Sequence, residues 1–269
     1  MTEDPRATLA ELVAQIHGHF RRRLRGLYLF GSLAAGGFYA GRSDLDLIAV
    51  LDTDVAKGRD LNSLRRLHES FESAYPAWRD RVEVLYISRG VLATFAAEPT
   101  GLVARVSPGE PMHLRALGGE IGWLLDWLGV VSGGETLVGP PPLTLGPPVS
   151  DQRFRAAVRS QLRELQRTVR GHDVAFVPVQ QGYIAASVAR ALYSLETGEQ
   201  TSKENAIAWL VARRPDLADF LWTAYREYRA DVRGPHQRLI DLVDDAADGA
   251  RLATGEDSGD ADISASRTP

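Results

Sequence analysis

The chain has 269 residues, of which 44% are hydrophobic and 25% charged, an ordinary composition for a folded protein of two modest domains. It contains no cysteine, which excludes a disulfide framework, a thiolate zinc site and a cysteine nucleophile. The net charge of -4 is too small to favour nucleic acid or a membrane surface as a partner. Because no signal peptide and no membrane-spanning apolar run is recognisable, a cytoplasmic protein is expected.

Residues 1–130 have the pattern of a small mixed α/β domain. Asp4 is suited to cap a helix that begins at Pro5, and the apolar run between Gly26 and Gly31 is typical of a short buried strand. A later segment alternates polar and apolar residues, which predicts a second strand. In chain order, the predicted elements are a helix over 5–23, strands over 27–30 and 44–51, a helix over 60–75 and a third strand over 81–87.

The composition changes abruptly after residue 130. Residues 131–150 are rich in glycine and proline, and we interpret them as a linker or extended loop. Helical patterns with short breaks follow over 151–253 and predict an all-α bundle domain, whereas the small, acidic residues 254–269 predict a disordered tail. The predicted bundle helices cover 151–170, 180–196, 202–213, 217–232 and 237–252.

Two aspartates at the start of the second predicted strand are candidate metal ligands. Side chains two apart in a strand point to the same face, so Asp44 and Asp46 present paired carboxylates. Such a pair is repulsive unless a cation or proton lies between them, and its hard oxygen atoms suit Mg²⁺. The turn at Gly31 and Ser32, directly after a strand, offers backbone N–H groups and a hydroxyl to a phosphate.

Glu83 is a third acid, in the middle of an otherwise apolar predicted strand, where it is costly without a partner. If its strand neighbours the second one, Glu83 joins Asp44 and Asp46, either as a third metal ligand or as a general base for an attacking hydroxyl. Together these residues favour metal-assisted phosphoryl or nucleotidyl transfer. A structural alternative stays open, in which the aspartates form a solvated strand face and Glu83 protects an edge strand.

These motifs resemble those of a known family. Residues 30–32 (FGS) and 43–47 (SDLDL) look like the signature of the nucleotidyltransferase superfamily. Residues 189–198 (ARALYSLETG), followed by Ser202 and Lys203, resemble the helical domain of aminoglycoside adenylyltransferases of the streptomycin and spectinomycin 3''/9 type. The resemblance implies a mixed α/β nucleotidyltransferase domain followed by an all-α domain, that is, an α+β fold class.

The resemblance also implies roles for individual residues. Asp44 and Asp46 would hold Mg²⁺, as two ions, together with Glu83, which is the catalytic base in the family. ATP would be the co-substrate and would bind with a small hydroxyl-bearing acceptor between the two domains. The residues implied to contact the nucleotide are Gly31, Ser32, Ser43, Arg190, Lys203 and Tyr228. Lys203 is one of only two lysines in the chain.

One segment departs from the family pattern. Relatives that act on streptomycin and spectinomycin have a tryptophan and acidic residues just before the helix that carries Arg190, where this chain has neutral Gln180 and Gln181. A polycationic drug is held largely by carboxylates, so the departure bears on the acceptor. We therefore expect transfer of AMP to a hydroxyl of a small molecule, with an aminoglycoside or aminocyclitol antibiotic as the first candidate.

Two kinds of alternative remain open at the level of sequence. The same chemistry would serve another acceptor, such as a lincosamide, a biosynthetic sugar intermediate or a protein hydroxyl. A non-catalytic nucleotide-binding module of antitoxin type would not transfer AMP at all, although such a module has little need for all three acids.

Overall fold

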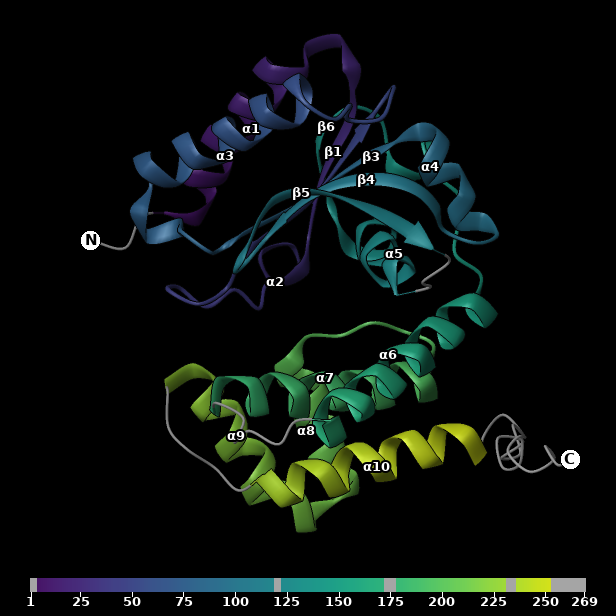
Figure 1. The fold of residues 1–269 in the computed structure, drawn as a ribbon. Helices are drawn as coiled ribbons and strands as arrows, with labels where there is room; N and C mark the ends of the chain where they lie inside the picture. The colour runs from purple at the N-terminus through teal and green to yellow at the C-terminus, as the bar shows by residue number, and fades with distance from the viewer. Residues whose placement is uncertain (1–3, 119–121, 172–177, 231–235, 253–269) are drawn as a thin grey trace, which may run out of the picture. The chain divides into compact units, whose positions relative to one another are not determined.

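A computed structural model describes residues 4–118, 122–171, 178–230 and 236–252 of the chain (Figure 1). At the helix ends 178–180, 227–230, 236–238 and 250–252 it describes the backbone alone. The chain divides into two compact units, of which the first comprises Met1–Val158 and Gly198–Asn205 and the second comprises Arg159–Thr197 and Ala206–Pro269. The predicted tail 254–269 lies outside the described residues.

The first unit is built on one mixed sheet of six strands in the order β5-β4-β3-β2-β1-β6. Strands β2 and β3 are parallel, and every other neighbouring pair is antiparallel. This is the mixed α/β architecture that the sequence predicts. The strand bounds are β1 Leu24–Phe30, β2 Leu45–Leu51, β3 Val82–Ser88, β4 Thr100–Ser107, β5 Glu110–Gly118 and β6 Glu135–Val138.

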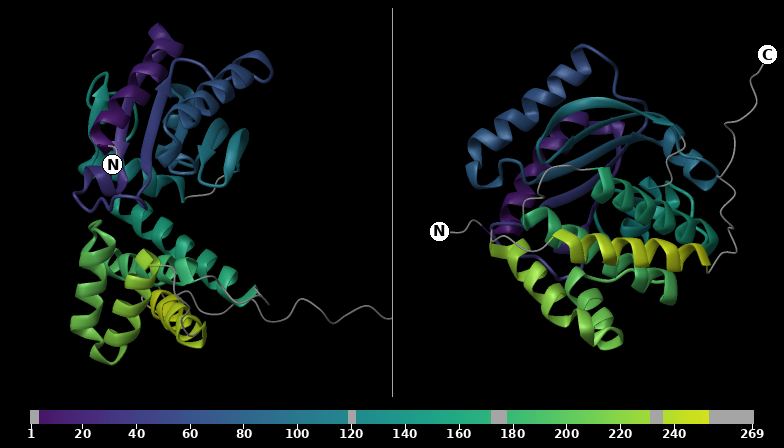
Figure 2. Two further views of the ribbon diagram at one scale, coloured as in Figure 1. Left: turned by 90° about the vertical axis from the view of Figure 1, so that its left-hand side faces the viewer. Right: turned by 60° about the horizontal axis from the view of Figure 1, so that its bottom comes forward.

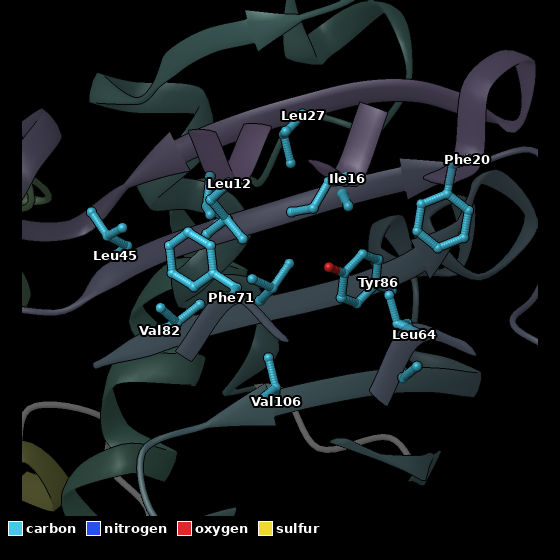
Figure 3. Packing of buried hydrophobic residues seen from close by; sticks show 14 of the residues in the cluster. Leu12, Ile16, Phe20, Leu27, Leu45, Leu64, Phe71, Val82, Tyr86 and Val106 are labelled. Atoms are coloured by element: carbon cyan, nitrogen blue, oxygen red, sulfur yellow. The ribbon is translucent and has the colours of Figure 1, made fainter. Parts of the chain in front are cut away.

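Helices cover both faces of this sheet. Helices α1 (Pro5–Phe20) and α3 (Arg59–Ala74) lie along one face, and α4 (Arg89–Ala93) and α5 (Trp123–Gly133) cover the other (Figure 1). Successive strand residues point to opposite faces, so each central strand supplies apolar side chains to both cores. Figure 3 shows the first core, where α1, α3 and the sheet contribute Leu12, Ile16, Phe20, Leu27, Leu45, Leu64, Phe71, Val82, Tyr86 and Val106.

The N-terminal helix begins as its sequence predicts and ends earlier. The side chain of Asp4 accepts a hydrogen bond from the backbone N–H of Arg6 at 3.0 Å, and Pro5 occupies the first helical position. The helix ends at Phe20 because Arg21 has a φ of 49°, outside the helical region. The predicted extension to Arg23 is therefore wrong, and the three arginines form a 3-10 turn instead.

Part of the glycine- and proline-rich segment 131–150 belongs to the sheet. Strand β6 pairs with β1, and the Tyr28 hydroxyl donates a hydrogen bond to the carbonyl of Pro140 at 2.9 Å. Trp127 Nε1 donates to the carbonyl of Pro147 at 2.8 Å. Gly139, with a φ of 91°, lies so close to the chain at Arg25 that a Cβ would come within 2.3 Å of the Arg25 carbonyl oxygen. These residues close the edge of the first unit, so the linker interpretation does not describe them.

The second unit is helical, as predicted. Helix α7 packs against α9 and α10 (Figure 2). The rings of Tyr193 on α7 and Trp209 on α8 meet edge to face with centroids 5.6 Å apart. The helix bounds are α6 Asp151–Gly171, α7 Pro178–Thr197, α8 Lys203–Arg213, α9 Ala218–Ala230 and α10 His236–Leu252. Within the described parts of the chain, no helix is both long enough and apolar enough to cross a membrane.

A buried histidine in the first core gives a testable dependence of stability on pH. His68 on α3 lies with Nε2 2.8 Å from the Tyr86 hydroxyl, and burial lowers the pKa of His68 from 6.5 to about 4. Between these values the unfolded chain binds the extra proton. The stability that neutral His68 contributes is therefore fully present above pH 6.5 and is lost as the pH falls toward 4.

We expect His68→Leu to remove this pH-dependent part, which amounts to about 3 kcal/mol in the free energy of unfolding. Urea unfolding at several pH values between 4 and 7 measures it as the difference from the wild-type chain. His17→Leu is the matched control, since His17 is exposed on α1. Parallel stability curves for the wild-type chain and His68→Leu would contradict the assignment of the pH dependence to His68.

Candidate active site

The three acids that the sequence singles out lie at the same edge of the sheet. Asp44 immediately precedes β2, Asp46 is the second residue of β2, and Glu83 is the second residue of β3. Strands β2 and β3 are parallel neighbours, and their register pairs Asp46 with Glu83. The condition under which Glu83 joins the two aspartates is thus met, and the alternation of the strand places all three on one face.

Gly31, in the turn after β1, lies next to the Asp46 carboxylate. Strand β1 runs antiparallel to β2 with Phe30 opposite Asp46, so Gly31 follows directly at the level of the aspartate. Gly31 has a φ of 71°, and a Cβ built on it would lie 1.9 Å from Oδ2 of Asp46. Only glycine fits this position, both because of its backbone conformation and because the Asp46 carboxylate fills the space of a side chain.

The pKa values of the two aspartates are raised, mainly by burial. Asp46 has a pKa well above its ordinary value, first because the protein shields it from water and then because of the negative charges of Glu83, Asp44 and Asp126. Burial and, to a lesser extent, Glu83 raise the pKa of Asp44 to about 6, and the cations Arg81 and Lys203 oppose this shift. The cluster holds an excess of negative charge that a bound cation would relieve.

The fit of this cluster to magnesium differs between its members. Asp44 and Asp46 offer hard oxygen atoms in a repulsive pair, which suits Mg²⁺ bound through one or two carboxylates and the phosphates of a substrate. Glu83 is already engaged, because its Oε1 accepts a hydrogen bond from Arg105 Nη2 at 2.7 Å. Among the described residues, no three histidine, aspartate or glutamate side chains form a metal-binding group. The structure therefore fits a two-aspartate site better than a three-acid site.

Arg81 organises the loop that leads into β2. Its Nε and Nη2 donate to the backbone carbonyl of Ser43 at 3.2 and 2.6 Å, and its guanidinium lies over the ring of Trp78, 4.5 Å from the centroid. The Ser43 hydroxyl oxygen in turn accepts a hydrogen bond from the N–H of Tyr39 at 2.9 Å. Ser43 thus has a structural partner in the loop, and its own hydroxyl proton is not used in that bond.

Ser32 lies in the short helix α2 (Gly31–Ala34), directly after β1. The N–H of Gly37 donates to the carbonyl of Ser32 at 2.9 Å, which holds the turn closed. The Ser32 side chain is half-buried and makes no hydrogen bond to the described residues. Ser32 and Gly31 therefore lie together at the end of β1, as their spacing predicts.

Lys203 belongs to the first unit although it follows a helix of the second. The segment Gly198–Asn205 groups with the sheet domain, and Gln200 Nε2 donates to the carbonyl of Leu125 on α5 at 3.2 Å. The charge of Lys203 lowers the pKa of both Asp44 and Asp46. The structure thus brings this lysine close enough to the acid cluster to act on it electrostatically.

The remaining predicted nucleotide contacts lie in the second unit. Arg190 is a half-buried residue of α7, and Tyr228 lies in α9 with its side chain outside the described residues. In the stretch that departs from the family pattern, Gln181 is buried in α7 and the side chain of Gln180 is not described. The acid cluster of the first unit is complete without these residues, and their roles stay predictions.

Arg105 and Trp123 are not predicted from the sequence, and neither is the position of Asp126 near Asp46. Arg105 lies on β4 and pairs with Glu83, Trp123 begins α5 beneath it, and Asp126 raises the pKa of Asp46. The short run 102–106 (LVARV), which is apolar except for Arg105, was the available signal for a strand.

Comparison with known proteins gives two informative results. Residues 144–250 match the family model described as the C-terminal domain of aminoglycoside adenylyltransferase. The fold matches that of spectinomycin adenyltransferase AAD(9) from Enterococcus faecialis, solved with ATP and spectinomycin. That match has a TM-score of 0.73 at 13% identity and covers 92% of this chain and 100% of that chain.

Two further comparisons add nothing to the assignment. A toxin-antitoxin structure with AMP-PNP matches at a TM-score of 0.27 and 15% identity over 60% of this chain and 92% of that chain, too low a score for an inference about fold. No curated protein matches. Residues 144–250 thus match an aminoglycoside adenylyltransferase C-terminal domain, and the fold of the chain resembles that of a solved spectinomycin adenyltransferase.

Proposed function

We propose that this protein is an ATP-dependent adenylyltransferase that moves AMP from ATP to a hydroxyl of an aminoglycoside or aminocyclitol. The observation that carries the proposal is the register that pairs Asp46 with Glu83, with Asp44 on the same face and Gly31 against the Asp46 carboxylate. Such a cluster has no structural advantage, because its members repel one another where water is excluded. The match of residues 144–250 to the C-terminal domain of aminoglycoside adenylyltransferase supports a functional reason for the acid cluster.

In the proposed reaction, Glu83 acts as the general base. The acceptor hydroxyl gives its proton to the Glu83 carboxylate, and the hydroxyl oxygen bonds to the α-phosphorus of ATP. The bond from that phosphorus to the bridging oxygen breaks, and pyrophosphate leaves. Mg²⁺, when held by Asp44 and Asp46 as two ions or one, would neutralise charge on the phosphates.

Other residues are proposed to bind the nucleotide. The turn of Gly31 and Ser32 is proposed to receive a phosphate, and Ser43 retains a hydroxyl proton to donate. Lys203 supplies a positive charge beside the aspartates, where a triphosphate would lie. Arg190 and Tyr228 of the helical domain are proposed to complete ATP binding.

Two findings support an aminoglycoside or aminocyclitol as the acceptor. One is the match of residues 144–250 to the aminoglycoside adenylyltransferase C-terminal domain, and the other is the similar solved structure, which contains spectinomycin. Gln180 and Gln181 replace acidic residues expected for streptomycin and spectinomycin, so the order of preference within this drug class is expected to differ. Pyrophosphate release from ATP and Mg²⁺, measured with each aminoglycoside and aminocyclitol in turn, tests the proposal. Release that rises only with an acceptor supports it, and acceptor-independent ATP hydrolysis alone would contradict it.

Lys203→Ala is expected to raise the KM for ATP by about 10-fold and to change kcat little, because a charged contact to phosphate contributes about 1.5 kcal/mol. Steady-state kinetics over a range of ATP concentrations measures the effect. Lys57→Ala is the matched control, since Lys57 is the other lysine of the chain and is exposed. An unchanged KM for ATP in Lys203→Ala would show that Lys203 does not contact the nucleotide.

A further inference from the structure

Arg105 and Glu83 form an ion pair inside the candidate active site. Arg105 Nη2 donates to Glu83 Oε1 at 2.7 Å, and the two side chains are only 21% and 25% exposed. The antiparallel register pairs Arg105 with Leu85, so Glu83 is its diagonal neighbour on the same face of the sheet. Half-buried, charge-assisted bonds of this kind fix side-chain orientation more firmly than exposed pairs do.

A tryptophan holds the arginine from the other side. The guanidinium carbon of Arg105 lies 5.4 Å from the ring centroid of Trp123, the buried first residue of α5. Arg115 on β5 stacks on the same indole ring, also at 5.4 Å, but it is exposed and forms no ion pair with the described residues. Both arginines thus contact the Trp123 ring, but only Arg105 also binds Glu83.

The ion pair with Arg105 engages only one of the two carboxylate oxygen atoms of Glu83. Oε1 is occupied by Arg105, whereas Oε2 accepts no hydrogen bond from the described residues. Asp46 lies in register with Glu83, and a cation shared by these acids would draw an unrestrained Glu83 carboxylate toward it. A carboxylate held by Arg105 resists that movement.

We propose that Arg105 is a positioning residue that orients Glu83 so that Oε2 takes the proton of the acceptor hydroxyl, leaving the metal to Asp44 and Asp46. This inference rests on the proposed adenylyl transfer. Arg105 touches neither substrate nor metal in this account. Its effect falls on the proton-transfer step, and ATP binding does not depend on it.

The test compares Arg105→Met, Arg105→Lys and Arg115→Met with the wild-type enzyme. Arg105→Met is expected to lower kcat by about 100-fold, the loss typical of a misplaced reacting group, and to leave the KM for ATP within about 2-fold. Arg105→Lys, which keeps a charged donor, is expected to recover part of kcat. Arg115→Met removes a guanidinium from the same indole ring and is expected to have wild-type kinetics.

Two readouts besides activity separate positioning from damage to the fold. Calorimetric binding of ATP with Mg²⁺ is expected to be unchanged in Arg105→Met, and its thermal unfolding is expected to stay a single transition. Where Arg105→Met does not fold, Arg105→Gln, which keeps a polar donor on a shorter, uncharged side chain, replaces it.

Three results would overturn the inference when the wild-type enzyme transfers AMP: an unchanged kcat in the variant of Arg105, an equal loss in Arg115→Met, or a weakened ATP affinity that explains the loss. Absence of transfer by the wild-type enzyme would instead overturn the proposed function.

Discussion

Gly31→Ala is expected to abolish AMP transfer and to lower the free energy of unfolding by about 3 kcal/mol. The added methyl group would lie 1.9 Å from Oδ2 of Asp46, so either the turn or the carboxylate must move. Backbone strain at a φ of 71° contributes about 1–2 kcal/mol, and overpacking adds a comparable amount. Urea unfolding and an AMP-transfer assay on the same preparation measure both losses.

Gly36→Ala is the matched control for this substitution. Gly36 also has a positive φ, of 74°, but nothing lies within 4 Å of a Cβ built on it. Gly36→Ala should therefore show the backbone strain alone, about 1–2 kcal/mol, and retain transfer. Equal losses of stability and activity in the two variants would mean that contact with the Asp46 carboxylate is not what requires glycine at position 31.

Asp46→Asn is expected to reduce kcat by about 1000-fold or more. At pH 8, without ATP or metal, its free energy of unfolding is expected to equal or exceed that of the wild-type protein. The pKa of Asp46 is raised by burial and by Glu83, Asp44 and Asp126. An acid with a raised folded-state pKa is charged at a cost to folding once the pH exceeds its unfolded value, and an amide removes that cost. The loss of activity follows from the loss of metal and phosphate neutralisation.

Asp52→Asn is the control for that prediction, because the pKa of Asp52 is shifted in the opposite direction from that of Asp46. The hydrogen bond from Arg25 lowers the pKa of Asp52, a partly exposed residue that follows the far end of β2 from Asp46. Its replacement is expected to leave transfer intact and to bring no gain in stability. Thermal unfolding and transfer kinetics of both variants decide the matter, and an active or clearly destabilised Asp46→Asn would contradict the electrostatic account of the site.

The sequence predicts the core of the sheet domain well because its signals there are local. Gly31 ends an apolar run, and alternation marks the strand after Asp44, so β1, β2 and β3 are predicted within three residues of their ends. The main discrepancy is the start of β1, where the structure adds Leu24–Gly26, with a register shift between Leu24 and Gly26 in the pairing with β2. No local signal marks that irregularity.

The sequence does not determine which strands are neighbours in the sheet, and therefore which side chains meet. The pairing of Asp46 with Glu83 depends on β2 and β3 being neighbours, which composition and periodicity do not determine. The bond from Arg105 to Glu83 depends in addition on the pairing of β4 with β3, and β4 has no distinctive sequence motif. The position of Arg105 beside Glu83 therefore follows only from the fold.

The segment 131–150 shows how composition misleads. Glycine and proline are common in linkers, but here Gly139 is needed where two stretches of chain approach closely, and Pro140 offers its carbonyl to buried Tyr28. Conversely, the segment Gly198–Asn205 belongs by sequence to the helical half and by contacts to the sheet unit. Sequence resemblance, not periodicity, identifies Lys203 within it.

Mass spectrometry of candidate acceptors incubated with the protein, ATP and Mg²⁺ shows directly whether this protein transfers AMP. We expect an aminoglycoside or aminocyclitol to gain one AMP moiety with the wild-type protein and none with Asp46→Asn. Binding of ATP by the wild-type protein without AMP transfer to any acceptor of the panel would contradict the proposed function, since the acids would then serve a nucleotide-binding module without transferase activity.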